Sequence, residues 1–164
     1  MSNPATTLRL VVVLPLHPLE GGAGFTLREW PLHLTLAPTF TTTDDLAATE
    51  AAVAPLLTSR STILVRAGRE EGFGRSMSRP ASVVDASPEL IGLHLALVAA
   101  LMATGAEFDH PEFTGTGYRP HITRTRVAGA TAGDLLELRQ AAIVDMAPAG
   151  DQRLRRVVWT ADLE

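Results

Sequence analysis

The sequence predicts one domain that mixes strands and helices. Strand-like and helix-like stretches are interleaved along the 164 residues, without a linker or a low-complexity segment between them. A chain of this length can bury a substantial core, and its 46% apolar and 20% charged residues are near globular averages. Each half of the chain also contains a strand-like stretch in which a histidine, an apolar residue and a threonine follow one another.

Two stretches in the first half have clear strand patterns. Residues 8–14 (LRLVVVL) are apolar and rich in valine, and a proline follows them, as is typical of a buried strand. Residues 32–39 alternate between apolar and polar side chains, which predicts a strand with one buried face. The other expected strands are 62–67, 81–84, part of 118–127, and a closing pair at 136–146 and 153–163 around Pro148-Ala149-Gly150. Residues 15–30 and 106–117 are expected to be loops.

Two helices are expected between these strands. The segment Thr43-Asp44-Asp45 has the residue types that cap a helix, and leucine and valine follow at helical spacing until Pro55 kinks or ends it. A second helix should begin with Ser87 as the cap and Pro88 in the first turn. Its end is expected near Thr104, because Gly105 is well placed to adopt the left-handed conformation that follows many helices.

Two residue types are missing from the chain, which excludes several kinds of chemistry. There is no cysteine, and all 14 basic residues are arginine, so there is no lysine. A thiolate nucleophile, a disulfide and a cysteine-ligated metal site are therefore excluded. A Schiff base, a P-loop lysine and an ATP-dependent ligase that adenylates its own lysine are excluded as well.

The net charge of −4 provides no overall basic field for long nucleic acids. It favours small ligands, or ligands recognised by a terminal phosphate, which local arginines can bind. The apolar stretch 90–103 is too short to cross a bilayer, and no convincing signal peptide precedes the first strand. We therefore expect a cytoplasmic protein that has no membrane contact and is compatible with a monomer; no protein partner is predicted.

The most informative motif occurs twice, as His33-Leu34-Thr35 and His121-Ile122-Thr123. Residues two apart on a strand face the same side, so each histidine shares a face with its threonine. Two such units suit cleavage of a phosphodiester without a metal or cofactor. One neutral imidazole takes a proton from water and the other, protonated, gives one to the leaving oxygen. The threonine hydroxyls would hold phosphate oxygens, and we expect about 5–8 Å between the imidazoles. The alternative is a pair of half-exposed strands facing solvent.

Two longer segments around these motifs resemble a known family. WPLHLTLAPTF (residues 30–40) and GYRPHITRTRV (residues 117–127) are similar to the signature strands of the two-histidine (2H) phosphoesterase superfamily. This superfamily contains 2′-5′ RNA ligase-like proteins and 2′,3′-cyclic nucleotide phosphodiesterases. The resemblance covers most of the chain and implies an α+β fold. That fold would be a duplicated two-lobed unit, with antiparallel sheets facing a central cleft and helices packed outside. Residues 1–164 would form one domain of two pseudo-symmetric lobes with one motif in each, 33–35 and 121–123.

The resemblance also implies roles for individual residues. His33 and His121 would be the acid and base, and Thr35 and Thr123 the phosphate ligands. Further substrate contacts are expected from Arg126, which matches a position where relatives often carry arginine, from Tyr118 and from Arg75. The chain departs from the family where Arg124 follows Thr123, since an apolar residue is usual there. Strict alternation would turn Arg124 away from the cleft. The glycine-rich stretch before His33 is also short where larger relatives have a helix.

The implied activity is a metal-independent phosphodiesterase acting on 2′,3′-cyclic phosphate or 2′-5′-linked RNA-type substrates, with a nucleotide or an RNA terminal phosphate as partner. Two alternatives stay open: a module that binds an RNA end or cyclic nucleotide without turnover, and an ATP-independent 2′-5′ RNA ligase. The direction of reaction and the roles of the two histidines are open too. Among the remaining histidines, His94 is expected to be packed, while His17 and His110 are expected at the surface. Tyr118 could equally pack beside its strand.

Overall fold

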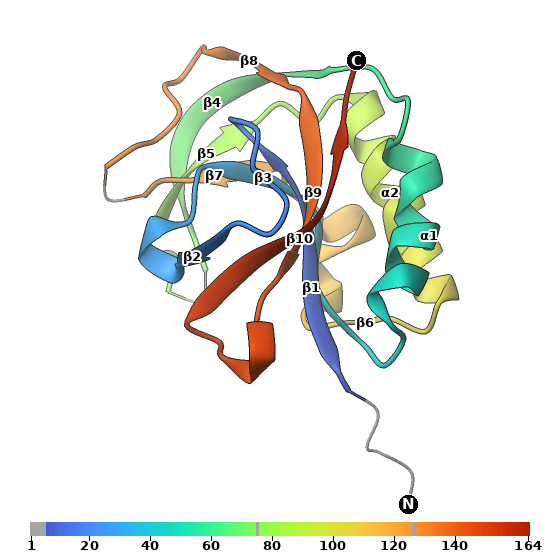
Figure 1. Ribbon diagram of the computed structural model, residues 1–164. Helices are drawn as coiled ribbons and strands as arrows, with labels where there is room; N and C mark the ends of the chain where they lie inside the picture. The colour runs from blue at the N-terminus through green and yellow to red at the C-terminus, as the bar shows by residue number, and fades with distance from the viewer. Residues whose placement is uncertain (1–5, 75, 126) are drawn as a thin grey trace, which may run out of the picture.

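A computed structural model describes residues 6–164 except Arg75 and Arg126. Its strands pair antiparallel in one curled sheet, and two helices lie together on one side of it (Figure 1). The strands are β1 (Leu8–Pro15), β2 (Gly24–Thr26), β3 (His33–Thr42), β4 (Ile63–Phe73), β5 (Arg79–Val84), β6 (Glu107–Phe108), β7 (His121–Thr123), β8 (Leu135–Leu138), β9 (Gln140–Asp145) and β10 (Leu154–Asp162). The helices are α1 (Leu46–Leu57) and α2 (Pro88–Ala103).

The order of strands across the sheet brings the two histidine strands together. It runs β2-β10-β9-β1-β3-β7-β5-β4-β8, and β6 pairs with β3 away from this path. The strands β3 and β7 are therefore neighbours near the middle of the sheet, although residues 43–120 separate them in the sequence. The α+β fold is confirmed. The division of 1–164 into two pseudo-symmetric lobes stays a prediction.

The main core lies between the sheet and the two helices. Leu34 and Ile122 point to this side from the central strands and are fully buried. The helices contribute apolar side chains at helical spacing: Val53, Leu57, Leu90, Leu93, Leu97 and Leu101. Burial of this many apolar side chains is the main favourable free energy that holds the helices on the sheet.

A smaller apolar cluster covers part of the opposite face of the sheet. Val13 faces this side and is paired directly with Thr35 of β3. The segment between β1 and β3 packs over it with Leu19, Ala23, Phe25 and Trp30. This segment, expected to be a loop, contains β2 and one short 3-10 turn (Leu27–Glu29). It covers the sheet where larger relatives of the family were expected to have a helix.

Both helices begin and end where the sequence predicts. The side chain of Asp45 accepts a hydrogen bond of 2.9 Å from the Ala48 amide, and Ser87 accepts one of 3.2 Å from the Leu90 amide. Pro55 lies within the last turn of α1, which ends two residues later at Leu57. Gly105 has a φ of 89°, the left-handed conformation expected after α2.

Three strands differ from their predicted extents. β7 has only three residues, since Pro120 precedes it and the Thr125 amide bonds to the Ala128 carbonyl in a turn. β4 continues to Phe73 through the glycine- and arginine-rich stretch, with an irregular register between Ala67 and Glu70. The stretch 136–146 forms two strands, because β8 pairs with β4 while β9 pairs with β1 and β10. The alternation of side chains along a strand shows its two faces, but it cannot show that the neighbouring strand changes partway along the stretch.

Candidate active site

The register between β3 and β7 places the two motifs against each other. Leu34 lies opposite Ile122 in an antiparallel pair. His33 therefore lies opposite Thr123, and Thr35 lies opposite His121. All four side chains are on the face of the sheet away from the helices, because Leu34 and Ile122 point into the helix-side core. On such a pair the diagonal neighbours His33 and His121 have backbones about 7–8 Å apart, which suits two imidazoles sharing one phosphate.

Both histidines present the same nitrogen atom to this face. Nδ1 of His33 lies 2.8 Å from the carbonyl oxygen of Pro31, and Nδ1 of His121 lies 2.7 Å from the carbonyl oxygen of Arg119. A carbonyl can only accept, so each Nδ1 carries the proton and donates it. Nε2 is then the basic nitrogen of both rings. In each case the acceptor belongs to the residue two positions earlier, so the local chain itself fixes the tautomer.

Both imidazoles also stack on an aromatic ring. The centroids of His33 and Trp30 are 4.2 Å apart with an interplanar angle of 22°. Those of His121 and Phe73 are 4.1 Å apart with an angle of 18°. Trp30 comes from the end of the segment that covers the small apolar cluster, and Phe73 comes from the end of β4. Parallel rings at these distances make extensive dispersion contact.

Burial keeps both imidazoles neutral in the free protein. It lowers the pKa of His33 to about 4, helped by the positive charge of His121 and opposed by the Pro31 carbonyl. The pKa of His121 is lowered chiefly by burial and also by the charge of Arg119, while the Arg119 carbonyl opposes this. A proton on His121 therefore disfavours a proton on His33.

The two threonine hydroxyls are free to bind a ligand. Thr35 is half-buried and Thr123 is exposed. Within residues 6–164, leaving aside the two undescribed arginines, neither hydroxyl donates or accepts a hydrogen bond with the protein. Two histidine nitrogens and two hydroxyl groups on one face can contact several oxygens of a phosphate group.

Of the three other expected substrate contacts, the structure describes one, Tyr118. Arg75 and Arg126 lie outside the described residues. Tyr118 packs within the protein, the alternative to a substrate contact. Its ring centroid lies 3.7 Å from that of His94, and its hydroxyl donates to the Thr35 carbonyl over 2.7 Å. Burial raises the pKa of this phenol, so it stays protonated and able to donate.

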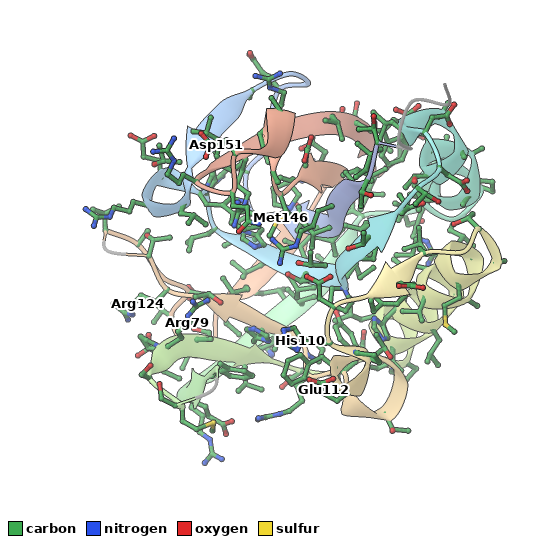
Figure 2. The ribbon with its side chains drawn as sticks, turned by 90° about the horizontal axis from the view of Figure 1, so that it is seen from below. Arg79, His110, Glu112, Arg124, Met146 and Asp151 are labelled. Carbon is green, nitrogen blue, oxygen red and sulfur yellow. The ribbon has the colours of Figure 1, made fainter. Side chains whose placement is uncertain are left out.

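Arg124, just after β7, and Arg79, at the start of β5, are near each other in the view of Figure 2, but strand pairing puts them on opposite faces of the sheet. The amide of Arg124 bonds to the Pro80 carbonyl, so the side chain of Arg124 shares a face with Ile122, as alternation predicts. There its Nε donates to Glu70 over 2.6 Å. Arg79 pairs with Phe73 and so shares the face of the two histidines. Arg79 is exposed, and no carboxylate of the described chain pairs with it.

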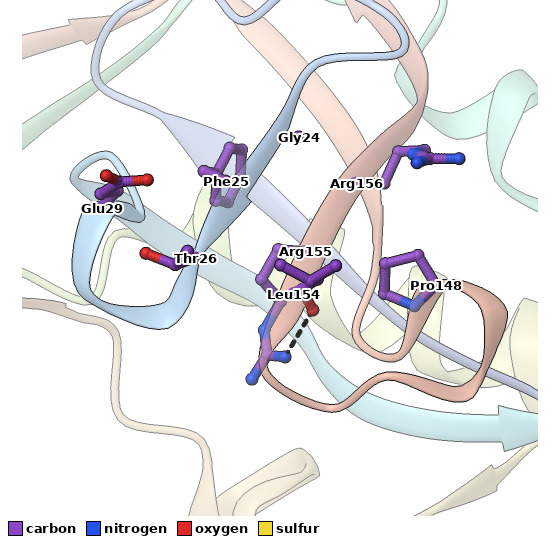
Figure 3. A pocket seen from close by; sticks show the side chains of 8 residues that line it. All are labelled: Gly24, Phe25, Thr26, Glu29, Pro148, Leu154, Arg155 and Arg156. Atoms are coloured by element: carbon purple, nitrogen blue, oxygen red, sulfur yellow. Dashed lines mark hydrogen bonds between the residues drawn. The ribbon is translucent and has the colours of Figure 1, made fainter.

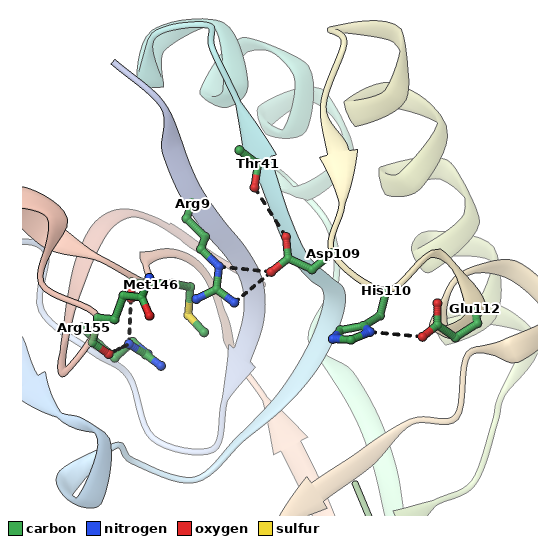
Figure 4. A network of polar contacts seen from close by, with 8 residues as sticks. Arg9, Thr41, Asp109, His110, Glu112, Met146 and Arg155 are labelled. Carbon is green, nitrogen blue, oxygen red and sulfur yellow. Dashed lines mark hydrogen bonds and ion pairs between the residues drawn. The ribbon is translucent and has the colours of Figure 1, made fainter. Parts of the chain in front are cut away.

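The remaining histidines lie where expected. His94 is fully buried, donates from Nδ1 to the Leu36 carbonyl over 2.6 Å, and accepts at Nε2 from the Gly115 amide over 3.0 Å. His17 and His110 are exposed. His110 contacts Glu112 at 3.1 Å, close to the ion pair between Arg9 and Asp109 (Figure 4). In the described part of the chain no three His, Asp or Glu side chains gather as a metal site would need.

A separate pocket of about 220 Å³ lies at β2 and β10 (Figure 3). It is lined by Gly24, Phe25, Thr26, Glu29, Pro148, Leu154, Arg155 and Arg156. Arg155 is only 7% exposed, and its Nη1 donates to three backbone carbonyls, those of Met146, Gln152 and Leu154. These bonds hold the guanidinium in place beneath the pocket. None of the four motif residues lines it.

Sequence reasoning missed Trp30 and Phe73 as parts of the site. Trp30 is close to His33 in the chain and could have been considered from its position alone. Phe73 could not, because it reaches His121 only through the pairing of β4 with β5 and of β5 with β7. The continuation of β4 past residue 67 was not expected either.

A curled antiparallel sheet with a histidine and a threonine on each of two adjacent strands is the arrangement expected of a two-histidine (2H) phosphoesterase. The family model described as the 2′-5′ RNA ligase superfamily matches residues 15–158, and the chain belongs to this superfamily. Its members share phosphoesterase chemistry in general. No curated protein matches the chain.

Solved structures share this fold at low sequence identity. The protein TT0787 of Thermus thermophilus is 17% identical, with a TM-score of 0.59, covering 95% of this chain and 98% of that one. Escherichia coli LigT complexed with 3′-AMP is 17% identical, with a TM-score of 0.58, covering 96% and 99%. LigT complexed with NADP+ is 16% identical, with a TM-score of 0.55, covering 95% and 97%. No helix of the described residues is long and apolar enough to cross a membrane.

Proposed function

We propose that the protein is a metal-independent phosphodiesterase acting on 2′,3′-cyclic phosphate or 2′-5′-linked RNA-type substrates. His33 and His121 serve as the general acid and base, and Thr35 and Thr123 bind the phosphate. The observation that carries this proposal is the pairing of Leu34 with Ile122, which sets the two motifs antiparallel on one face. Crystal structures of LigT with 3′-AMP, ATP and phosphate support a nucleotide or phosphate ligand for this fold.

On a cyclic phosphate the reaction needs one proton removed and one supplied. Nε2 of one neutral imidazole takes a proton from water as the water oxygen bonds to phosphorus. The bond from phosphorus to one ribose oxygen breaks, and the other imidazolium gives its Nε2 proton to that oxygen. The product is a phosphomonoester. Burial lowers the pKa of both histidines, so neither holds this proton without substrate at neutral pH. A phosphate anion bound between them favours the charged form of an imidazole and so raises its pKa, which lets one histidine gain the proton.

The test is hydrolysis of 2′,3′-cyclic nucleotides in the presence of EDTA by wild type, His33→Ala and His121→Ala. Each substitution should lower kcat by about 100- to 10,000-fold, the usual contribution of a general acid or base. His110→Ala is the matched control, because the side chain of His110 is exposed, lies in neither motif and bonds to Glu112; the kcat of this variant should equal that of wild type. A silent wild type, or two active-site variants that keep its rate, would contradict the proposal for this substrate. Loss of activity in EDTA would contradict metal independence.

Ligation by the same site is the second candidate, favoured by the family description. Ligation opens the same ring with an RNA 5′-hydroxyl in place of water: the 5′-oxygen bonds to phosphorus, one ribose oxygen leaves, and the same four side chains can serve both reactions. The chain has no lysine, and ligation must therefore start from a pre-activated cyclic phosphate end without ATP. Incubation with an RNA 5′-hydroxyl and a cyclic phosphate end distinguishes the two directions. Binding measured by calorimetry with no product of either kind would favour a binding module.

A further inference from the structure

An arginine guanidinium accompanies each of the two aromatic–imidazole stacks. The Cζ atom of Arg119 lies 4.9 Å from the ring centroid of Phe73, and that of Arg155 lies 5.3 Å from Trp30. Both histidines therefore belong to a group of three: an imidazole, an aromatic ring and a guanidinium over the same ring. We propose that Trp30 and Phe73 are positioning residues that hold the imidazoles of His33 and His121 so that Nε2 faces the phosphate. This inference rests on the proposed function of the two histidines.

The aromatic ring supplies a constraint that the hydrogen bond at Nδ1 lacks. A single Nδ1–H···O=C bond tolerates a range of angles, so the imidazole can still rotate to some extent about its Cβ–Cγ bond. A parallel ring at about 4 Å blocks this rotation, because tilting the imidazole would cause overlap on one side and lose contact on the other. The two contacts together determine where Nε2 points. Proton transfer depends steeply on that position.

Each aromatic ring is itself held by its arginine. Arg155 is anchored by its bonds to three backbone carbonyls, and its guanidinium lies over the half-buried indole of Trp30. Arg119 is anchored by its ion pair with Glu71, which also binds Arg69. A guanidinium over an aromatic ring is attracted to the ring face. The ring is thereby fixed in the plane that the imidazole adopts.

The repetition argues that the stacks serve the imidazoles and are not incidental packing. Trp30 precedes His33 on the same segment, whereas Phe73 comes from β4, on the far side of β5 from His121. Two unrelated chain positions thus supply the same contact. The indole Nε1 of Trp30 is buried without a partner in the described chain, an unfavourable state that a phenyl ring would avoid.

The test compares removal and conservative replacement of each ring. Phe73→Leu and Trp30→Leu remove the stack, while Phe73→Tyr and Trp30→Phe keep a ring. Phe113→Leu is the matched control: Phe113 is exposed and lies beside His110, with ring centroids 5.5 Å apart. Circular dichroism verifies folding of each variant. Imidazole ¹⁵N NMR then reports the tautomer and pKa of His33 and His121 without substrate, and turnover of 2′,3′-cyclic nucleotide gives kcat and KM.

We expect Phe73→Leu to lower kcat about tenfold and to change KM much less, because the ground-state phosphate contacts remain. In the NMR spectrum, the pKa of His121 should rise as water enters, while its Nδ1–H tautomer, which the Arg119 carbonyl selects, persists and His33 stays unchanged. Among the described residues, Arg119, Glu71, Arg79 and His33 are the charged or titrating groups on the His121 face of the sheet, and none is altered. Trp30→Leu should lower kcat in the same way, but it should change the pKa of His33 and leave His121 unchanged. The two conservative variants should retain wild-type kcat and tautomers.

Unchanged histidine pKa values together with an unchanged kcat in both leucine variants would overturn the inference. Equal losses of kcat in the leucine and the conservative variants would overturn it too, since an aromatic ring would then not be enough to hold the imidazole. If wild type turns over no substrate while Phe73→Leu still disturbs His121 alone, the positioning role stands and the proposed activity fails. The NMR measurement thus separates the two.

Discussion

The hydroxyl of Tyr118 donates a hydrogen bond of 2.7 Å to the backbone carbonyl of Thr35. This bond ties the segment that leads to His121 directly to the strand that carries His33. The ring of Tyr118 stacks on His94, which bonds in turn to the Leu36 carbonyl and the Gly115 amide. Helix α2, strand β3 and the loop before β7 are therefore joined through the stacked rings of the fully buried His94 and the half-buried Tyr118.

Tyr118→Phe should lower the free energy of unfolding by about 1 kcal/mol, because it removes the hydrogen bond and keeps the stacked ring. Urea unfolding followed by circular dichroism measures this. The exposed aromatic Phe113 gives a control, as Phe113→Leu should alter stability much less. Equal stability of Tyr118→Phe and wild type would mean that water replaces the hydroxyl at the Thr35 carbonyl.

Stability should rise with pH between about 4 and 6.5, the range set by the folded pKa of His33 and the ordinary value for histidine. Burial lowers the pKa of His33, His94 and His121, so the unfolded chain binds more protons than the folded one in this range. The stabilisation is complete above the ordinary pKa and is lost as pH falls towards the folded one. His94→Gln should be less stable than wild type at neutral pH but should show a smaller pH dependence. Parallel pH curves for the two proteins would contradict this assignment to His94.

Thr35→Val and Thr123→Val should each reduce kcat/KM about tenfold or more, because each removes a hydroxyl that we propose to bind the phosphate. Their unfolding midpoints should stay close to wild type, since neither hydroxyl bonds to the described part of the protein. Thr35→Ser and Thr123→Ser keep the hydroxyl and should retain most activity. Valine variants as active as the serine variants would remove the threonines from the phosphate site.

Arg79→Gln and Arg124→Gln form a matched pair on opposite faces of neighbouring strands. Arg79 is exposed on the histidine face, so its loss should raise KM by about three- to tenfold, as expected for a charge-assisted contact to an anion. Arg124 is paired with Glu70 on the other face, and its loss should leave kcat/KM within about twofold. Steady-state kinetics on a cyclic nucleotide at low salt makes the comparison. The reverse order of effects would place Arg124, not Arg79, beside the substrate.

The sequence by itself determined the features that depend on neighbours along the chain. The caps at Asp45 and Ser87, the glycine after α2, and the strands around His33 and His121 follow from residue type and periodicity, which act over a few positions. The equivalence of the two His-x-Thr units was visible for the same reason. The resemblance of the flanking residues to the 2H phosphoesterases then indicated the family.

Only the tertiary structure decided which residues surround these motifs. The extension of β4 to Phe73 and the split of 136–146 into two strands depend on partner strands far away in the chain. Periodicity describes the faces of a strand but carries no information about its neighbours. The adjacency of β3 and β7, and with it the approach of two histidines from opposite halves, is likewise a result of strand order. So are the stacking of Phe73 on His121 and the bond from Tyr118 to Thr35, because long-range pairing alone brings these residues together.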